Sequence, residues 1–149
     1  MSIPTSATEF LDAKRIEQLI EVRFPQIHAG GRNLVIEEVG PRMARVRMRA
    51  DPRNTRPGGT ISGMAMFALA DFSVYVAIIG RLGEGGLDAV TSNLNINFLA
   101  KPQARDMTAS VRLLRLGRRL AVGEVELFSE GVTDMVAHAI ASYALPVRA

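Results

Sequence analysis

The stretch GMAMFALADFSVYVAIIG, Gly63–Gly80, decides the fold of this chain. Its composition predicts one long helix that is apolar on all sides and is covered by the rest of the protein. Asp71 interrupts the pattern, because its neighbours at helical spacing include no Lys, Arg or His: Met64, Phe67, Ala68, Val74, Tyr75 and Ile78. A buried carboxylate is costly unless it becomes neutral or finds a partner elsewhere in the fold or in a second chain. Asp71 is therefore a candidate site residue; the alternative is that it faces solvent or bonds a nearby backbone amide.

A buried helix explains this stretch better than a membrane span does. Its 18 residues are marginal for crossing a bilayer, and a central Asp costs roughly 2.5 to 3.5 kcal/mol on insertion. The chain has 149 residues, 48% of them hydrophobic, which is enough to bury the core of one domain. Cysteine is absent, which excludes disulfides, thiolate nucleophiles and cysteine metal sites. Glu9 and Asp12 stand where a signal peptide has its apolar run, so we expect a cytoplasmic protein.

Arginine dominates the basic residues of a chain whose net charge is +3. Because the guanidinium fork binds phosphate well, a phosphorylated ligand or nucleic acid is a hypothesis to weigh. Aromatic residues make up 5% of the chain and Trp is absent, which disfavours nucleic acid because stacking residues are scarce. Arg45, Arg47 and Arg49 alternate with Val46 and Met48, a pattern typical of the solvent face of a half-buried strand.

The segments before the long helix predict one surface helix and two strands. Ser6 and Glu9 have the spacing of a capping box, and the amphipathic pattern that follows ends at Pro25, so we predict a helix over about 6–24. Strands are expected at 34–39 and 43–50, on either side of a Gly-Pro turn. A loop over 51–61 leads into the long helix, and residues 81–86 are expected to be a loop after it.

Everything after the long helix is predicted to be antiparallel strand. Alternating apolar and polar residues, or turn signals between them, place strands at 93–98, 107–113, 120–128 and 135–145. A curved antiparallel sheet of about six strands is the natural cover for a helix that is apolar on all sides. We therefore predict an α+β fold in a single domain, 1–149, with its core at about 34–146.

This plan and its local motifs resemble the hotdog fold, and within it the phenylacetate-degradation (PaaI-like) acyl-CoA thioesterases. Members of that family show Asn-Pro-x-Gly-x-x-His-Gly-Gly at the start of the central helix and an Asp nine residues after the His. The corresponding segment here is RPGGTISGM, 56–64, in which Ser62 takes the position of the His and Asp71 follows nine residues later. TSNLNINFLAKP, 91–102, and GRRLAVGEVEL, 117–127, are similar to later strands of the family. The resemblance covers roughly residues 34–145.

The resemblance implies hydrolysis of an acyl-CoA thioester. Asp71 would act as nucleophile, through a mixed anhydride, or as general base on a water molecule. The Gly63 N–H at the helix start would hold the oxyanion, because the first amides of a helix lack internal partners. These two residues are eight positions apart, hence about 12 Å along one helix, too far to act on the same carbonyl. The resemblance implies that the protein is a homodimer in which each site is shared between the two chains. It further implies that two dimers pair to form a homotetramer.

The chain also departs from the family motif. Arg56, Ser62 and Met64 stand where the family has Asn, His and the second Gly. Ser62 is predicted to be the N-cap of the helix, with a substrate-contacting hydroxyl as the alternative. The only histidines are His28 and His138, and neither is near the motif in sequence, which disfavours the histidine-dependent dehydratases of this fold. We expect His138 to be a satisfied strand residue.

The remaining candidate residues follow from the same resemblance. Substrate contacts are predicted at six positions: Asn54, Arg56, Ser62, Met64, Tyr75 and Thr91. Thr91 is equally compatible with an ordinary β-branched strand residue. The nucleotide end of coenzyme A is assigned to basic residues in turns, each of which is otherwise a solvent-exposed charge: Lys101, Arg105, Arg118 and Arg119. No metal or cofactor is expected, since coenzyme A is part of the substrate.

Two rival functions remain from the sequence. A hotdog protein could bind an acyl-CoA or another apolar ligand without hydrolysing it, which loss of the His and Asn favours and retention of Asp71 opposes. A regulatory or nucleic-acid-binding protein is supported by Arg content alone.

Overall fold

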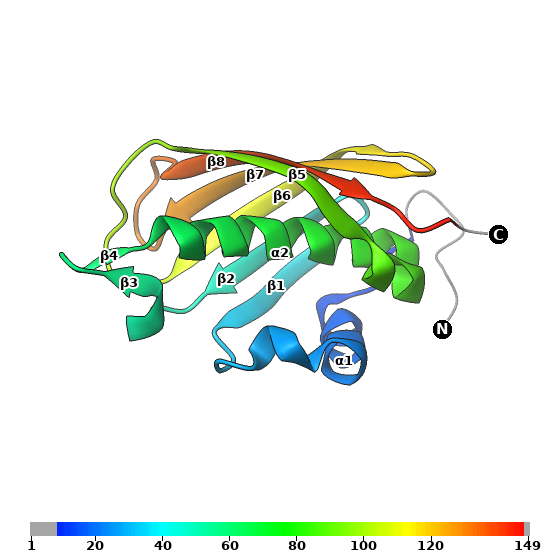
Figure 1. Cartoon of the computed structure of the whole chain (residues 1–149), viewed down its shortest axis with the longest axis horizontal. Coiled ribbons are helices and arrows are strands. Elements are labelled where there is room, and N and C mark those ends of the chain that lie inside the picture. Colours follow the sequence, from blue (N-terminus) through cyan, green and yellow to red (C-terminus); the bar gives the residue numbers. More distant parts are fainter. Residues whose placement is uncertain (1–8, 148–149) are drawn as a thin grey trace.

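One long helix, α2, is cradled by a curved six-stranded antiparallel sheet (Figure 1). The computed structural model describes residues 9–147. The sheet has the strand order β1-β2-β6-β7-β8-β5, so β1 and β5 are its edges. The elements in chain order are α1 (Ala13–Arg23), η1 (Pro25–His28), β1 (Leu34–Gly40), β2 (Met43–Met48), η2 (Pro52–Asn54), β3 (Thr55–Arg56), β4 (Thr60–Ile61), α2 (Gly63–Leu82), η3 (Gly83–Asp88), β5 (Val90–Phe98), β6 (Met107–Leu116), β7 (Leu120–Ser129) and β8 (Ala137–Ala144).

These elements confirm the predicted fold class, an α+β hotdog arrangement of six strands around one central helix. Helix α2 packs its apolar side chains against the inner face of the sheet, with Leu69, Val74 and Ile78 fully buried. By length and hydropathy α2 could cross a membrane, but 72% of its apolar stretch is buried inside the molecule. It is therefore the core helix of a folded domain.

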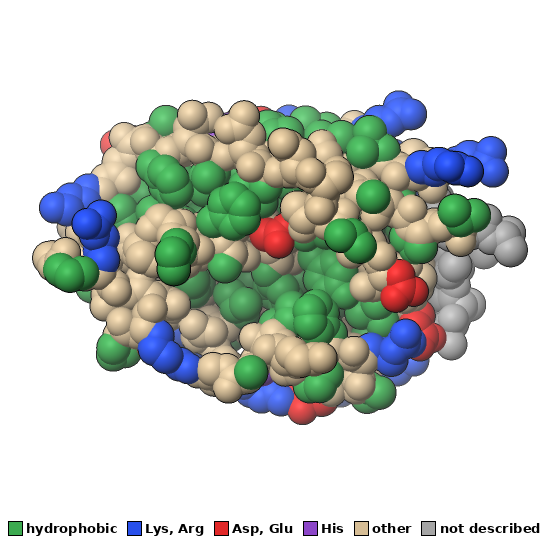
Figure 2. All heavy atoms as spheres, in the orientation of Figure 1, with side chains coloured by type: hydrophobic (Ala, Val, Ile, Leu, Met, Phe, Trp, Pro, Cys, Tyr) green, Lys and Arg blue, Asp and Glu red, His purple; other side chains and the backbone are tan. Residues whose placement is uncertain are grey.

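One side of α2 is left uncovered near its start. Met64, Phe67 and Ala68 are exposed, and Asp71, one turn further along, is half-buried. Figure 2 shows this side of the molecule: hydrophobic side chains fill its centre, an acidic side chain lies among them, and basic side chains gather toward the two ends. The prediction that the helix is covered on all sides by its own chain is therefore wrong at this stripe, Met64, Phe67, Ala68 and Asp71.

The first helix is shorter than the sequence predicted. Helix α1 begins at Ala13, and residues 9–12 are not helical. Asp12 is the N-cap, because its side chain accepts the N–H of Arg15 at 2.9 Å. The Leu11 N–H donates to the carbonyl of Gly80 at 2.8 Å, so this segment is tied to the end of α2 instead of extending α1. The predicted cap at Ser6 lies outside the described residues.

Other boundaries moved by a few residues. Helix α2 continues to Leu82 and is followed by the 3₁₀ turns of η3, where the sequence predicted a loop. Strand β2 ends at Met48, two residues early, and the Ala50 N–H is bonded to the Asp106 side chain instead. Strand β5 begins at Val90, three residues earlier than predicted.

Candidate active site

Asp71 projects from the middle of α2 and is held by two hydroxyl groups. Thr91 Oγ1 on β5 donates to Asp71 Oδ1 at 2.7 Å. The Tyr143 hydroxyl on β8 lies 2.6 Å from the same Oδ1 and 2.9 Å from the Asp71 carbonyl oxygen. Within residues 9–147, no Lys, Arg or His forms an ion pair with this carboxylate. The partner expected from elsewhere in the fold is therefore a pair of neutral donors.

A bulge in β5 brings these two donors to the same face of the sheet. From Asn93 onward, the odd-numbered residues of β5 share the outer face, and regular alternation would place Thr91 there too. The register shifts between Thr91 and Asn93, so that Thr91 lies directly opposite Tyr143 while Asn93 lies opposite Ser142. Ser92 is the extra residue, and a bulge of this kind re-aims a side chain. Thr91 consequently faces α2 and reaches Asp71.

Tyr143 is fixed in place by a second tyrosine. The two rings of Tyr75 and Tyr143 stack with centroids 6.3 Å apart, and Tyr75 meets Phe24 edge to face at 6.1 Å. The Tyr75 hydroxyl donates to the carbonyl of Leu87 at 2.8 Å. Burial raises the pKa of Tyr75 to about 12. Burial, and after it the hydrogen bond to Asp71, raise the pKa of Tyr143 far above its usual value, so its hydroxyl keeps its proton.

The start of α2 opens on an apolar hollow. Ser62 caps the helix by accepting the Ala65 N–H at 3.1 Å, which confirms the predicted N-cap. The next residue, Gly63, lines a hollow of about 350 Å³ together with four apolar side chains, Met64, Phe67, Ile96 and Phe98. A Cβ built on Gly63 would lie 3.3 Å from the Phe98 ring. Glycine is therefore what allows Phe98 to lie so close to the helix start.

Asn54 and Arg56 lie beside this helix start, in the segment that leads into it. The carbonyl of Asn54 accepts the Ser62 N–H at 2.7 Å, and the Asn54 amide nitrogen is buried without a hydrogen-bond partner in the described structure. Arg56 is exposed on β3, in a small hairpin with Thr60 on β4. Met64 is 83% exposed at the rim of the hollow. Substrate contacts by these three residues stay predictions, and so does a contact by Tyr75, which is 6% exposed.

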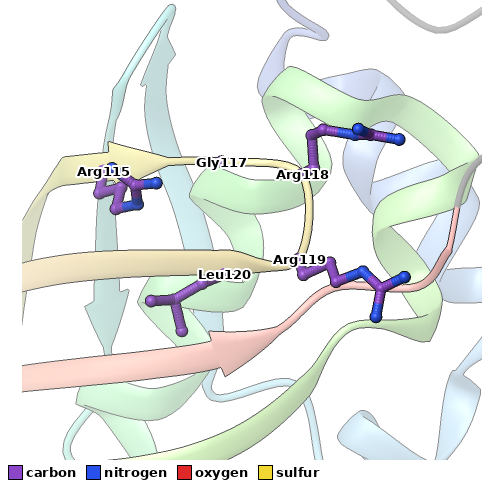
Figure 3. Close-up of a pocket in the computed structure, with 5 residues that line it drawn as sticks. All are labelled: Arg115, Gly117, Arg118, Arg119 and Leu120. Carbon is purple, nitrogen blue, oxygen red and sulfur yellow. The ribbon is translucent and has the colours of Figure 1, made fainter.

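The four basic residues assigned to coenzyme A lie in two separate groups. Lys101 and Arg105 precede β6, whereas Arg118 and Arg119 follow it in the turn to β7. The ten residues of β6 extend over about 33 Å, so one protomer does not bring the two groups together. Arg118 and Arg119 line a hollow of about 380 Å³ with Arg115, Gly117 and Leu120. In Figure 3 the side chains of Arg118 and Arg119 extend from the turn toward the same side, whereas the side chain of Arg115 lies apart from them.

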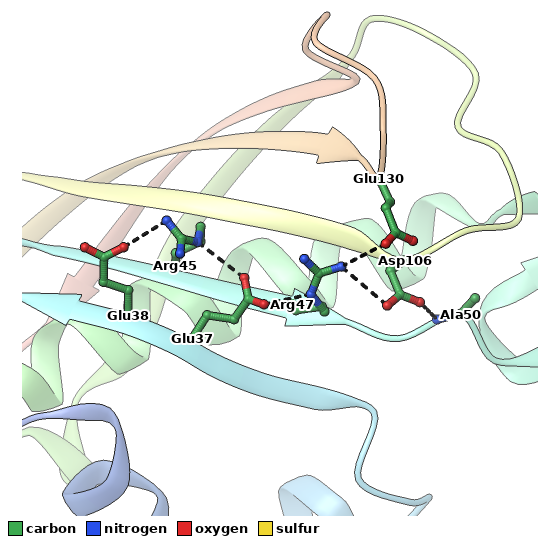
Figure 4. Close-up of polar contacts among 7 residues, drawn as sticks. All are labelled: Glu37, Glu38, Arg45, Arg47, Ala50, Asp106 and Glu130. Carbon is green, nitrogen blue, oxygen red and sulfur yellow. Dashed lines mark hydrogen bonds and ion pairs between the residues drawn. The ribbon is translucent and has the colours of Figure 1, made fainter.

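Charged residues on the outer face of the sheet are paired with one another. Arg47 contacts Glu37 at 2.8 Å and Asp106 at 3.4 Å, and Arg45 contacts Glu38 at 2.8 Å (Figure 4). This confirms that Arg45 and Arg47 belong to the solvent face of a strand. The Arg47 hydrogen bond lowers the pKa of Glu37.

Neither histidine is bonded to Asp71. His138 on β8 lies 3.0 Å from Glu124 Oε2 on the outer face, which confirms the prediction of a satisfied strand histidine. His28 in η1 has a covered ring 3.7 Å from Glu17 Oε2, beyond hydrogen-bonding distance. Among residues 9–147, no three His, Asp or Glu side chains are grouped so that they could hold a metal ion.

Sequence reasoning missed Tyr143, Phe67 and Phe98. Tyr143 follows Ala137, Ala139 and Ala141 on the inner face of the last strand, so alternation could have identified its direction but not its partner. Phe98 belongs to a face expected to be buried, yet it is 52% exposed because the stripe of α2 opposite it is open.

Comparisons with known proteins agree with this geometry. A family model described as the thioesterase superfamily matches residues 58–136, more than half of the chain. A solved structure of a candidate thioesterase from Silicibacter sp. TM1040 is 38% identical; the match covers 97% of this chain and 99% of that one, with a TM-score of 0.83. The phenylacetic acid degradation protein PaaI from Thermus thermophilus is 25% identical, with 82% and 99% covered and a TM-score of 0.69. A candidate esterase from Saccharolobus solfataricus is 24% identical over 139 residues, 93% of this chain and 83% of that protein. The chain therefore belongs to the thioesterase superfamily: it is a hotdog-fold thioester hydrolase, and PaaI is among its structural neighbours.

Proposed function

We propose that this protein is an acyl-CoA thioesterase that hydrolyses a small or medium acyl-CoA or aryl-CoA. The observation that carries the proposal is Asp71, a half-buried carboxylate in an apolar helix, held by two hydroxyl donors and, within residues 9–147, by no cation. A group so expensive to place there has an evident use in acyl transfer and no evident use in packing.

Two routes of hydrolysis are open to Asp71. As a general base it takes a proton from a water molecule while the water oxygen attacks the thioester carbonyl; the carbon–sulfur bond then breaks and the coenzyme A thiolate leaves. As a nucleophile the carboxylate attacks the carbonyl itself and expels the thiolate, and water then cleaves the mixed anhydride to acid and free Asp71. Both routes develop negative charge on the carbonyl oxygen, which needs a donor.

Gly63 is the proposed donor, contributed by the second chain of a dimer. Its N–H is at the first turn of α2, where the helix dipole favours an anionic oxygen. Eight residues of helix separate it from Asp71 of the same chain, about 12 Å. Two features of this chain support a dimer: β5 is a sheet edge paired on one side only, and the uncovered stripe of α2 lies next to it. An antiparallel second copy on this face would bring its Asp71 toward Gly63.

The apolar hollow at Gly63 indicates the acyl group. Its lining of Met64, Phe67, Ile96 and Phe98 offers no charge and no hydroxyl, which suits an aliphatic or aromatic acyl chain. In the proposed dimer the basic residues at the ends of this face, Lys101 and Arg105 from one chain and Arg118 and Arg119 from the other, would face the phosphates of coenzyme A. We assign the protein to the cytoplasm, as a dimer or dimer of dimers, without a metal or further cofactor.

A non-catalytic acyl-CoA binding protein is the alternative. Ser62 and Arg56 in place of the family His and Asn favour it. The hydroxyl pair on Asp71 opposes it, because a binding protein has no evident need for an oriented carboxylate.

Thiol release from a panel of short, medium and aryl acyl-CoA esters tests the proposal. We expect turnover with at least one ester, and a loss of about 10² or more in Asp71→Asn, the scale of removing an acid/base group. Glu37→Gln is the matched control, since it makes the same change on the outer face and should leave turnover unaltered. Tight binding of the esters without thiol release would establish the binding protein instead, and an Asp71→Asn enzyme within a few-fold of wild type would remove Asp71 from the mechanism.

A further inference from the structure

Tyr143 contacts Asp71 directly, yet neither route of hydrolysis above requires it. Both hydroxyl donors converge on the same oxygen, Oδ1, with Thr91 at 2.7 Å and Tyr143 at 2.6 Å. The second oxygen, Oδ2, receives no hydrogen bond from the described residues. The two oxygens of this carboxylate are therefore not equivalent.

We propose that Tyr143 is a positioning residue, which together with Thr91 holds Oδ1 of Asp71 so that Oδ2 alone is presented to water or to the thioester. The inference rests on the proposed function of Asp71. It adds that Oδ1 is held by hydrogen bonds while Oδ2 takes part in the reaction. Two donors from neighbouring strands fix both the side-chain rotamer and the tilt of the carboxylate, which is the preorganisation that acyl transfer needs.

Tyr143 is well suited to this role because its hydroxyl keeps its proton and its ring is buried. The hydroxyl keeps its proton and can donate it, since burial and the hydrogen bond to Asp71 raise the pKa of Tyr143 far above its usual value. The side chain is 3% exposed, so water does not compete for the bond. Both oxygens within reach of the Tyr143 hydroxyl belong to Asp71, Oδ1 at 2.6 Å and the carbonyl oxygen at 2.9 Å, so the buried phenol stays bonded to this residue.

Three aromatic rings in contact connect this hydroxyl to the N-terminal helix. Phe24, the C-cap of α1, meets the edge of Tyr75, and Tyr75 stacks on Tyr143. Tyr75 is anchored in turn by its bond to the Leu87 carbonyl. The end of α1 is therefore linked to Asp71 by ring contacts through Tyr75 and Tyr143, although α1 supplies no residue to the site itself.

Steady-state kinetics of Tyr143→Phe give the first test. The variant keeps the ring and removes the bond to a charged oxygen, so kcat should fall about ten- to a hundredfold while KM stays within about twofold. Thr91→Val should behave alike, and Thr91→Ser, which keeps the hydroxyl, should recover most of kcat. Ser73→Ala is the control for losing a buried hydroxyl near Asp71: its Oγ bonds the Leu69 carbonyl, and kcat should not change.

Fluorine NMR tests the contact independently of activity. The chain contains two tyrosines, so 3-fluorotyrosine labelling gives two signals that Tyr75→Phe and Tyr143→Phe assign. In Asp71→Asn the Tyr143 signal should shift because its charged acceptor is gone, whereas the Tyr75 signal should stay close to its original position.

The outcomes separate this inference from the proposed function. An inactive Asp71→Asn enzyme beside a Tyr143→Phe enzyme with unchanged kcat would overturn the positioning role and leave Asp71 in place. A Tyr143 signal that does not shift in Asp71→Asn would overturn the positioning role as well. If Asp71→Asn itself stays active, Asp71 is not part of the mechanism and the positioning role falls with it, while the NMR shift still reports whether Tyr143 contacts the carboxylate.

Discussion

The two faces of the sheet treat a carboxylate in opposite ways. On the outer face, Glu37 accepts bonds from Arg45 and Arg47 at 3.3 and 2.8 Å and is part of a network of alternating charge. On the inner side, Asp71 accepts bonds from two uncharged hydroxyls. Both carboxylates accept bonds from their own chain, but among residues 9–147 Glu37 has cationic partners and Asp71 has none.

The difference bears on the role proposed for Asp71. A guanidinium fork occupies the oxygens of its partner and stabilises their charge, which lowers both basicity and nucleophilicity. Hydroxyl donors orient an oxygen without cancelling the charge, so the remaining oxygen can take a proton or attack a carbonyl. Solvent-exposed pairs such as those of Arg45 and Arg47 contribute modestly to stability, typically below about 1 kcal/mol each.

Mixing two inactive variants should produce the largest change in activity, because it tests whether Asp71 acts together with a second chain. Asp71→Asn removes the carboxylate, and Gly63→Pro removes the N–H at the helix start; each homodimer should be inactive. If the sites are shared between chains, heterodimers contain one intact site and recover up to about half the activity of an equal amount of wild-type dimer. Thiol release measured before and after exchange of the two chains checks this.

Gly63→Ala is the matched control for the proline variant. It keeps the N–H and adds a Cβ about 3.3 Å from the Phe98 ring, so any loss it shows reports displacement of Phe98 and not loss of the donor. Heterodimers that form but stay inactive, or an active monomer at all dilutions, would contradict shared sites and confine the chemistry to one chain.

Ser62→Ala should have an intermediate effect, on stability and not on turnover. The variant loses the N-cap bond to the Ala65 N–H, which costs about 1 kcal/mol. Urea unfolding monitored by circular dichroism, beside thiol release, measures both quantities. A stable variant that loses nearly all turnover would show that Ser62 performs part of the role that the family gives to histidine.

The smallest effect should be a change in how stability depends on pH, and it should come from Glu37 on the outer face. The pKa of Glu37 is lowered in the folded protein, first by Arg47, so its contribution to stability is present above the unfolded pKa and is lost as pH falls through the folded one. Between about pH 5 and pH 3 the unfolding midpoint of wild type should therefore fall more steeply than that of Glu37→Gln. Equal slopes would contradict the pairing; 1 M salt should reduce the difference.

Much of the fold followed from periodicity in the sequence. The apolar run from Gly63 predicted the central helix. Alternation of apolar and polar residues, as on either side of Arg47, together with turns such as the one at Gly117, predicted the six strands. The start of α1 was wrong because the bond from Leu11 to Gly80 is a tertiary contact, which no local pattern reports. Ser62 was predicted correctly because capping is a local interaction.

The candidate site was predictable only in part. Asp71 stood out because its charge conflicts with its surroundings, a signal visible in sequence. Its partners did not, since Thr91 has the spacing of an outward residue and reaches Asp71 through a change of register, and Tyr143 is 72 residues away in the chain. The separation of Lys101 from Arg119 likewise depends on strand length and direction in three dimensions.

The bulge at Ser92 makes one point of β5 tolerant of changes in chain length. Ser92 has no register partner in β8, although its Oγ donates to the Ser142 carbonyl at 3.1 Å. Deleting Ser92 would join Thr91 to Asn93 in regular alternation and leave Thr91 opposite Tyr143. An insertion or deletion elsewhere in the strand would rotate part of it by half a turn. The register of residues 93–98 and the position of the Thr91 hydroxyl are therefore set on opposite sides of Ser92.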